Sequence, residues 1–242
     1  MPVKPIPAST VIVLKDTPDG LKTYLLQKSK SLEFAGGAYV FPGGTIKEQD
    51  QDPEWFSYSS NLPFPDWQKL FPESVEKELL GFYISAIREL FEEAGILLCE
   101  NHLSSENLKK MRESLLAGKS FLEIAQERHL KLLAERLTYL SHWITPEVFK
   151  TRFSARFFIT ELLNDQTPSP DGKEILKGTW IAPEKALEQY HKNQISLMFP
   201  TMTTLQELSP FKTIKEVIEW GEKQPKIPRK PWVDEKGEIH LL

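Results

Sequence analysis

One helical segment, residues 76–94, constrains the fold of this chain most, because its sequence combines an apolar face with a concentrated acidic face. Glu89, Glu92 and Glu93 stand at positions i, i+3 and i+4, and an α-helix projects residues at this spacing from one side. Leu90 points away from the acidic edge and can anchor the helix to a sheet. The segment therefore predicts a helix that packs on an apolar layer and presents three carboxylates on one patch.

Three carboxylates on one patch repel one another, and a bound divalent cation removes this penalty. Oxygen-rich sites suit Mg²⁺ or Mn²⁺ better than Zn²⁺, so the helix face is a candidate metal site. The same spacing occurs on many solvated helix faces, and a surface patch of ordinary ion pairs is the alternative interpretation. Arg88, four residues before Glu92, can pair with that glutamate.

Composition and charge argue against several classes of protein. At roughly 150 residues per domain, the chain of 242 residues is one large domain or one domain with an appendage. The net charge of −4 and the lack of a basic stripe argue against a nucleic-acid partner, and no stretch approaches the roughly 20 apolar residues of a membrane span. The single cysteine, Cys99, cannot form an internal disulfide, and the N-terminal residues lack the apolar run of a signal peptide. We therefore expect a cytoplasmic protein without a membrane partner.

Local patterns outside the acidic helix predict a mixture of strands and helices. Residues 10–14 and 22–27 are short apolar runs on either side of the turn sequence Thr17-Pro18-Asp19-Gly20, so they predict a β-hairpin. Further strands are expected at residues 137–144, 153–163 and 179–181. Further helices are expected at residues 105–117, from the capping-box sequence Ser120 to Glu123 onward, and at residues 183–191 and 201–220. Residues 233–242 alternate around Lys236-Gly237 and predict a second hairpin.

The acidic helix resembles part of the signature of the Nudix hydrolase superfamily. This signature reads glycine, five residues, glutamate, seven residues, and then Arg-Glu-aliphatic-any-Glu-Glu-any-Gly-aliphatic. Residues 88–96 match the second half at every specified position. The glycine-rich entry is similar to Phe41-Pro42-Gly43-Gly44, and the first glutamate position falls on Asp50. Residues 51–87 then separate Asp50 from Arg88, so an insertion interrupts the motif and the role of Asp50 stays open.

The resemblance implies an α/β (α+β) fold in which a mixed β-sheet lies between helices, with extra helices after the motif. The Nudix domain would cover residues 8–220, with insertions at 51–80 and 104–136, and residues 221–242 would form a C-terminal tail. The aromatic residues of the first insertion would either wall a substrate pocket or seal an apolar edge of the domain. These residues are Trp55, Phe56, Tyr58, Phe64, Trp67 and Phe71.

The resemblance also implies roles for the residues of the motif. The expected ligands of Mg²⁺ or Mn²⁺ are Glu89, Glu92 and Glu93. Arg88 would orient a carboxylate, and Gly43 and Gly44 would let the backbone approach the substrate closely. One of the helix glutamates, or Glu174 in a loop before a strand, would accept the proton of the attacking water. Glu174 could instead be a further metal ligand or an ordinary loop residue.

Several segments further resemble the branch of this superfamily that contains the peroxisomal coenzyme A diphosphatases and their bacterial relatives. They are 25–29 with 37–44, 143–146 with 152–158, 174 with 180–187, and 200–201 before 205. This branch implies cleavage of coenzyme A or acyl-coenzyme A to 3′,5′-ADP and a 4′-phosphopantetheine. Lys28, Arg152 and Arg156 would bind the phosphates of this substrate.

The motif leaves two alternative functions open. A Nudix pyrophosphatase for ADP-ribose or dinucleotides needs the same metal face and a smaller pocket. A non-catalytic Nudix-fold binding module needs no metal face, so the intact glutamates argue against it. The sequence does not predict an oligomeric state.

Overall fold

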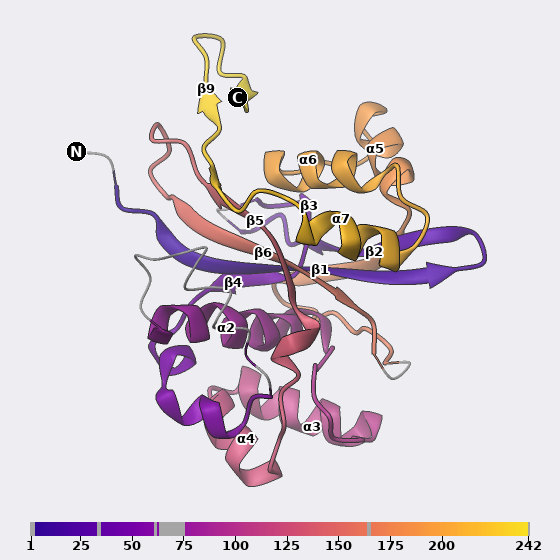
Figure 1. Cartoon of the computed structure of the whole chain (residues 1–242). Helices are drawn as coiled ribbons and strands as arrows, with labels where there is room; N and C mark the ends of the chain where they lie inside the picture. The colour runs from indigo at the N-terminus through magenta and orange to yellow at the C-terminus, as the bar shows by residue number, and fades with distance from the viewer. Residues whose placement is uncertain (1–2, 33–34, 61, 63–75, 164–165, 242) are drawn as a thin grey trace.

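A mixed β-sheet between two layers of helices forms the body of the protein (Figure 1). The computed structural model describes residues 3–32, 35–60, 62, 76–163 and 166–241. The long strand β1 (Ile6–Thr17) lies inside the sheet, between β6 on one side and β2 and β4 on the other.

The sheet contains both parallel and antiparallel strand pairs. Its other strands are β2 (Gly20–Lys28), β3 (Tyr39–Val40), β4 (Gly43–Thr45), β5 (Thr138–Ile144), β6 (Phe153–Glu161), β7 (Ile175–Ile181) and β8 (Pro228–Arg229). Strand β1 is parallel to β6, and β5 is parallel to β8. The other pairs in this sheet, including the predicted β1–β2 hairpin, are antiparallel. The sheet is therefore mixed, as expected.

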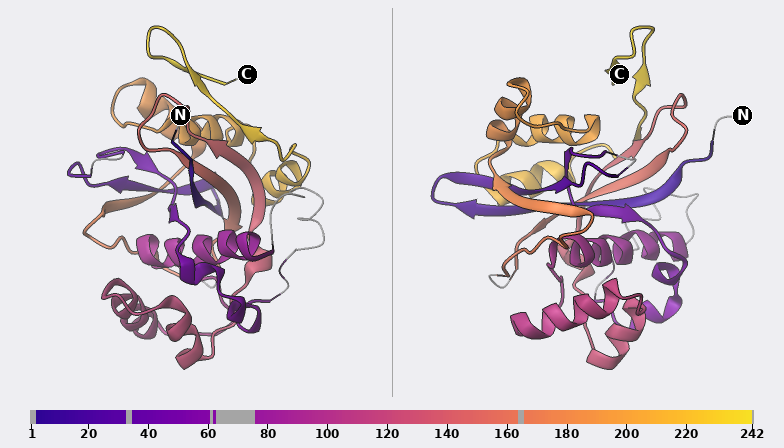
Figure 2. Two further views of the ribbon diagram at one scale, coloured as in Figure 1. Left: turned by 90° about the vertical axis from the view of Figure 1, so that its left-hand side faces the viewer. Right: turned by 180° about the vertical axis from the view of Figure 1, so that it is seen from behind.

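Helices cover both faces of the sheet (Figures 1 and 2). On one face lie α2 (Glu76–Ala94), α3 (Ser105–Leu116) and α4 (Phe121–Arg128), and on the other lie α5 (Pro183–His191), α6 (Phe199–Leu208) and α7 (Ile214–Glu222). The short 3-10 helices are η1 (Glu48–Gln51), η2 (Pro53–Ser57) and η3 (Ala134–Arg136). This arrangement confirms the predicted α/β sandwich with extra helices after the acidic one. Among the described helices, none is long and apolar enough to cross a membrane.

The sequence of β1 explains why the sheet carries helices on both faces. Val11 and Val13 pack in an apolar core with α2. Ile12 and Leu14 point the other way, into a core with α5, α6 and α7. Because successive residues of a strand point to opposite faces, an uninterrupted apolar run needs cover on both sides. Leu90 anchors α2 in the first of these cores.

The predicted helix at residues 201–220 consists of two helices, α6 and α7, with a break at residues 209–213. Pro210 lacks the N–H group that would continue the hydrogen-bond ladder of a helix. Thr213 then caps α7, because its hydroxyl accepts the N–H of Glu216 and the Glu216 carboxylate accepts the N–H of Thr213. The prediction of one helix is wrong. The apolar periodicity continues from α6 into α7, but Pro210 and the cap at Thr213 divide the segment into two helices.

The first insertion packs against the second in its described part. Trp55 of η2 is fully buried, and its ring centroid lies 5.1 Å from that of Phe121 in α4. Its indole N–H donates to the carbonyl of Gln49 at 2.8 Å. This part of the insertion seals an apolar core, as one of the two sequence interpretations has it. Phe64, Trp67 and Phe71 lie outside the described residues.

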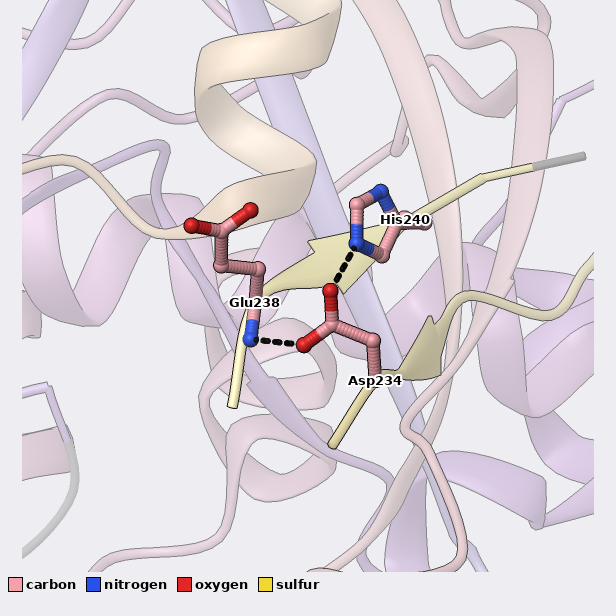
Figure 3. A group of neighbouring side chains, drawn as sticks. All are labelled: Asp234, Glu238 and His240. Carbon is pink, nitrogen blue, oxygen red and sulfur yellow. Dashed lines mark hydrogen bonds and ion pairs between the residues drawn. The ribbon is translucent and has the colours of Figure 1, made fainter. Parts of the chain in front are cut away.

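The C-terminal segment ends in the predicted hairpin. Its strands are β9 (Trp232–Val233) and β10 (Ile239–His240). Asp234 fixes the turn, because one carboxylate oxygen accepts the N–H groups of Lys236 and Glu238. The other oxygen lies 2.8 Å from Nε2 of His240 (Figure 3). Before this hairpin, β8 pairs with β5, so residues beyond 220 extend the main sheet.

Candidate active site

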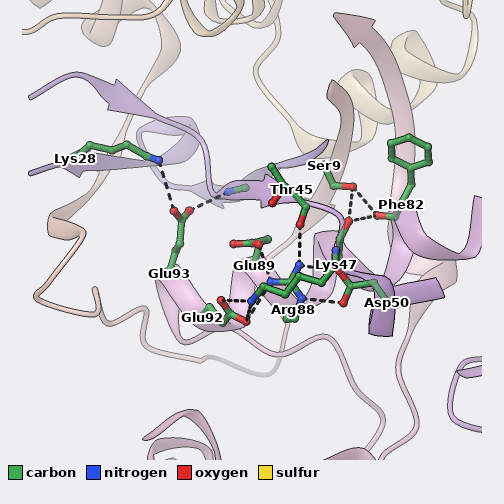
Figure 4. Close-up of polar contacts among 12 residues, drawn as sticks. Ser9, Lys28, Thr45, Lys47, Asp50, Phe82, Arg88, Glu89, Glu92 and Glu93 are labelled. Carbon is green, nitrogen blue, oxygen red and sulfur yellow. Dashed lines mark hydrogen bonds and ion pairs between the residues drawn. The ribbon is translucent and has the colours of Figure 1, made fainter. Parts of the chain in front are cut away.

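Helix α2 holds its acidic face against the loop that enters β4 and the end of β2 (Figure 4). Leu90 of the same helix turn is buried in the apolar core, which fixes the rotation of α2 and the direction of its acidic face. Glu89 and Glu93 are only 8% and 5% exposed, and Glu92 is more open. Because solvated helix faces do not bury carboxylates to this degree, the burial argues against an ordinary surface patch.

Arg88 is fully buried in the middle of this face. Its Nε and Nη2 atoms donate to the two carboxylate oxygens of Asp50 at 2.8 and 2.7 Å. Its Nη1 atom donates to Glu89 at 2.6 Å and to Glu92 at 3.1 Å, and Nη2 also reaches the carbonyl of Thr45. A guanidinium fixed by two parallel bonds to one carboxylate has a defined orientation. Arg88 therefore holds three carboxylates in fixed positions relative to one another.

Asp50, which stands at the first acidic position of the signature in the sequence, lies directly beside Arg88 in the structure. It is fully buried and accepts the backbone N–H of Lys47 at 2.8 Å in addition to its two bonds from Arg88. Helices η1 and α2 bring the two residues together although residues 51–87 separate them. The residues on either side of the insertion, Asp50 and Arg88, are therefore in direct contact.

The glycine loop packs directly on two of the glutamates. The N–H of Gly43 donates to Oε2 of Glu93 at 2.9 Å. A Cβ atom on Gly44 would lie 2.5 Å from the carboxylate carbon of Glu89, so no larger residue fits there without displacing that side chain. Lys28 at the end of β2 places its Nζ atom 4.0 Å from Oε1 of Glu93. The loop and β2 thus set the positions of both buried carboxylates.

Burial controls the charge of this site. It raises the pKa of Glu89, against the lowering effect of Arg88. It also raises the pKa of Glu93 to about 8, although Lys28 acts in the opposite direction. Burial disfavours the charge of Arg88 too, but the hydrogen bond to Asp50 and the nearby carboxylates outweigh it and raise the pKa of Arg88. The site therefore holds two carboxyl groups whose ionisation is disfavoured by burial, beside the buried cation of Arg88 and the more open side chains of Lys28 and Lys47.

The donor set of this face fits a hard divalent cation. The donors are carboxylate oxygens, which are the ligands that Mg²⁺ and Mn²⁺ prefer. The carboxylate of Glu89 lies in the space that a side chain on Gly44 would fill. The Nζ atom of Lys47 lies 3.1 Å from Oε1 of Glu92, so a positive charge already contacts this face. On this face the candidate metal ligands are Glu89, Glu92 and Glu93, whereas the described residues whose ligand atoms lie within 4.8 Å of one another are Asp234, Glu238 and His240 in the C-terminal hairpin.

Glu174 lies directly before β7 with an exposed side chain. Its backbone carbonyl accepts the N–H of Ser29, and the described residues show no bond from its carboxylate to the acidic face of α2. The negative charge of Asp171, in the same loop, raises the pKa of Glu93. The carboxylate of Asp171 accepts the N–H groups of Lys173 and Ile175, which form a turn.

Arg152 and Arg156 do not meet the glutamates in the described structure. Arg152 is buried and donates to the carbonyl groups of Thr145 and Val3, so it joins the N-terminal segment to the β5–β6 connection. Arg156 on β6 is also buried, and its guanidinium carbon lies 4.0 Å from the ring centroid of Phe82. Both side chains are buried because segments distant in the sequence pack over them: the N-terminal segment at Val3 for Arg152, and Phe82 of α2 for Arg156.

Two further cationic residues contact the acidic helix. Lys47, which pairs with Glu92, lies in the variable spacer of the signature, and its position close to the glycine loop is the signal that could have indicated it. Arg112 of α3 donates through Nε and Nη2 to the backbone carbonyl of Glu92. It belongs to an insertion without a motif, so no sequence signal indicates it.

The fold and the acidic helix together define a Nudix domain. A crystal structure of a NUDIX hydrolase from Alicyclobacillus acidocaldarius has the same fold, with a TM-score of 0.75. The match covers 90% of this chain and 96% of that one at 18% sequence identity.

The chain belongs to the NUDT19 Nudix domain family, which matches residues 8–208. It is similar to the curated proteins named acyl-coenzyme A diphosphatase NUDT19 from Xenopus laevis, at 30% identity, and from Homo sapiens, at 26%. These matches cover 80% and 82% of this chain. The chain spans only 61% and 63% of the length of these two relatives.

Proposed function

We propose that the protein is a metal-dependent diphosphatase that cleaves coenzyme A or acyl-coenzyme A to 3′,5′-ADP and a 4′-phosphopantetheine. The observation that carries the proposal is the buried network in which Arg88 holds Asp50, Glu89 and Glu92 together. A binding module without catalysis does not need a buried acidic face of this kind. The name of the relatives from Xenopus laevis and Homo sapiens supports the choice of substrate.

The carboxylates of α2 would form the metal site. Glu89, Glu92 and Glu93 would hold Mg²⁺ or Mn²⁺, which when bound neutralises charge on the diphosphate oxygens and makes the attacking water more acidic. Arg88 holds Glu89 and Glu92 through its Nη1 atom, so their positions are set before the substrate binds. The N–H of Gly43 does the same for Glu93.

A carboxylate near the attacking water must also accept its proton. The helix glutamates are candidates, and so are Asp171 and Glu174 in the loop before β7. The charge of Asp171 raises the pKa of Glu93, so this carboxylate already acts on the site. Glu174 is exposed and would have to turn towards the site. Kinetics of Asp171→Asn and Glu174→Gln separate the two: the variant that lowers kcat with little change in KM identifies the group that acts in the transition state.

Lys28 and Lys47 would supply positive charge for the phosphates of the substrate. They are the lysines that contact Glu93 and Glu92, at 4.0 and 3.1 Å. When a metal ion neutralises the glutamates, both ammonium groups are available for phosphate oxygens instead. Arg152 and Arg156, which the sequence also indicated, are buried elsewhere and have no part in this proposal.

A substrate panel tests the proposal against its alternatives. We expect the highest kcat/KM for coenzyme A or acyl-coenzyme A, compared with dephospho-coenzyme A, ADP-ribose and NADH, in Mg²⁺ or Mn²⁺ and with products identified by mass. A higher value for ADP-ribose or NADH would favour the dinucleotide pyrophosphatase. Absence of hydrolysis of every compound, with binding retained, would favour a non-catalytic module.

A further inference from the structure

Arg112 lies on the inserted helix α3 and directs its guanidinium at the end of α2. The side chain is 8% exposed. Its Nε and Nη2 atoms donate to the carbonyl oxygen of Glu92 at 3.0 and 2.7 Å, and Nη1 donates to the carbonyl oxygen of Ser169 at 2.5 Å. One side chain from the insertion therefore contacts both the acidic helix and the loop that leads to β7.

The end of α2 is built to receive this guanidinium. The last carbonyl groups of a helix have no partner within the helix and carry its negative dipole end, which a cation stabilises. Gly95 follows the helix with φ +69°, and a Cβ atom there would lie 3.2 Å from Nη1 of Arg112 and 3.4 Å from the carbonyl oxygen of Ser169. The glycine of the motif thus makes the turn and leaves room for Arg112.

Further contacts fix the loop before β7 to the end of the helix. The N–H of Ser169 donates to the carbonyl of Ala94 at 2.8 Å. The amide of Gln166 makes two hydrogen bonds to the backbone of Leu97, at 2.9 and 3.0 Å. Asp171, two residues after Ser169, is close enough for its charge to affect both Glu93 and Arg112. The position of this loop relative to the glutamates therefore depends on these contacts together with the bond from Arg112 to Ser169.

We propose that Arg112 is a positioning residue for the diphosphatase reaction, through which α3 sets the geometry of Glu92, Glu93 and Asp171. This inference rests on the proposed function. The physical reason is that Arg112 binds the backbone of Glu92 itself. Loss of the Arg112 side chain would therefore shift the backbone that carries the Glu92 carboxylate. Misplacement of a reacting group by about 1 Å lowers turnover by about 100-fold.

The experiment compares Arg112→Lys, Arg112→Gln and Arg112→Ala with the control Lys109→Gln, a change on the exposed face of α3. For folded protein, kcat and KM are measured with coenzyme A, and the Kd for Mn²⁺ is measured by calorimetry without substrate. We expect Arg112→Gln to lower kcat about 10- to 100-fold with a smaller change in KM, and to weaken Mn²⁺ binding. Arg112→Lys keeps the charge but not the three hydrogen bonds, so its kcat and its affinity for Mn²⁺ should lie between those of Arg112→Gln and of the wild type. Added guanidinium should restore part of the activity of Arg112→Ala, and the control should behave as wild type.

A purely structural role gives a different result. Arg112→Gln, or Arg112→Lys if the Gln variant does not fold, would then melt at a lower temperature but show wild-type kcat and Mn²⁺ affinity while folded, which overturns the inference. Glu93→Gln is measured in parallel. If Glu93→Gln is inactive and the Arg112 variants are fully active, only the inference fails. If Glu93→Gln is fully active, the proposed function fails.

Discussion

Arg88 is a buried cation whose three carboxylate partners come from two segments of the chain. Asp50 accepts hydrogen bonds from Nε and Nη2 of its guanidinium, and Glu89 and Glu92 both accept from Nη1. Since burial disfavours the charge of Arg88, the network is stable only while its carboxylates stay in place. The geometry of the acidic face and the stability of the protein therefore depend on the same residues.

The Asp50→Ala variant should be strongly destabilised. Removing one partner of a buried ion pair leaves the other charge uncompensated and costs about 3–5 kcal/mol. Urea unfolding measures this loss, and Asp52→Ala is the matched control, since Asp52 is exposed and accepts one backbone N–H. A loss for Asp50→Ala no larger than that of the control would contradict the importance of this pair.

The Glu93→Gln variant should separate activity from stability. We expect kcat to fall by at least about 100-fold, as when a preorganised charged group is lost. Stability in the presence of chelator should stay unchanged or rise, because glutamine removes a charge that burial disfavours and still accepts the N–H of Gly43. Activity assays and thermal melts of both forms check this, with Glu113→Gln on the exposed face of α3 as control. Full activity of Glu93→Gln, or of the wild type in excess chelator, would refute the metal-dependent mechanism.

The sequence predicts the common direction of the three helix glutamates and indicates Lys28 among the cations near them, but it indicates neither Lys47 nor Arg112. The spacing of Glu89, Glu92 and Glu93 follows from helix geometry alone, so their common direction can be read from the sequence. The partner of Arg152 is the carbonyl of Val3, 149 residues away, which no local pattern contains. The same holds for Arg112, whose role depends on where an insertion packs.

At the level of elements, the two insertions and α2 form one packed unit on one face of the sheet. The boundaries of α3 and α4 follow from local signals, since Ser104 caps α3 and a capping box with Ser120 begins α4. The packing of η2 against α4 does not follow from such signals, because aromatic residues in a proline-rich segment suit either a pocket wall or a seal. Burial of Trp55 against Phe121 decides for a seal in the described part.

The Trp55→Ala variant tests this role of the first insertion. Removal of a fully buried tryptophan should cost about 3–5 kcal/mol in unfolding free energy. The ratio of kcat/KM for coenzyme A to that for ADP-ribose should not change, because a seal does not touch the substrate. Phe56→Ala is the control, since Phe56 is the next residue in the chain and is 42% exposed. A changed substrate ratio with little loss of stability would show that this segment is part of the pocket instead.

For the whole molecule, the half of the sheet away from β4 carries buried basic residues of its own. The acidic face of α2 lies beside β4, while His142 on β5 and Arg156 on β6 are buried in the other half of the sheet. His142 on β5 is 7% exposed, its Nε2 atom lies 2.7 Å from the hydroxyl of Ser154, and its Nδ1 atom has no hydrogen-bond partner among the described residues. Burial lowers the pKa of His142 from 6.5 to about 4, and the charges of Arg156 and Lys230 add to this effect. The folded protein therefore keeps this ring neutral at a pH where the unfolded chain protonates it.

This difference predicts a loss of stability in weak acid. Between pH 6.5 and about 4 the unfolded state binds a proton at His142 that the folded state does not, so the free energy of unfolding falls as the pH falls through this window. At about 1.4 kcal/mol for each pH unit, the loss reaches at most about 3 kcal/mol. The raised pKa of Glu93 acts in the opposite direction, because the folded state binds that proton first, so the wild-type curve alone does not isolate His142. The measurement is urea unfolding at pH 7.5 and pH 4.5 for wild type, His142→Asn and the exposed control His191→Asn. We expect His142→Asn to lose less stability than the other two on acidification, and equal losses in all three would show that His142 does not set the acid sensitivity of the fold.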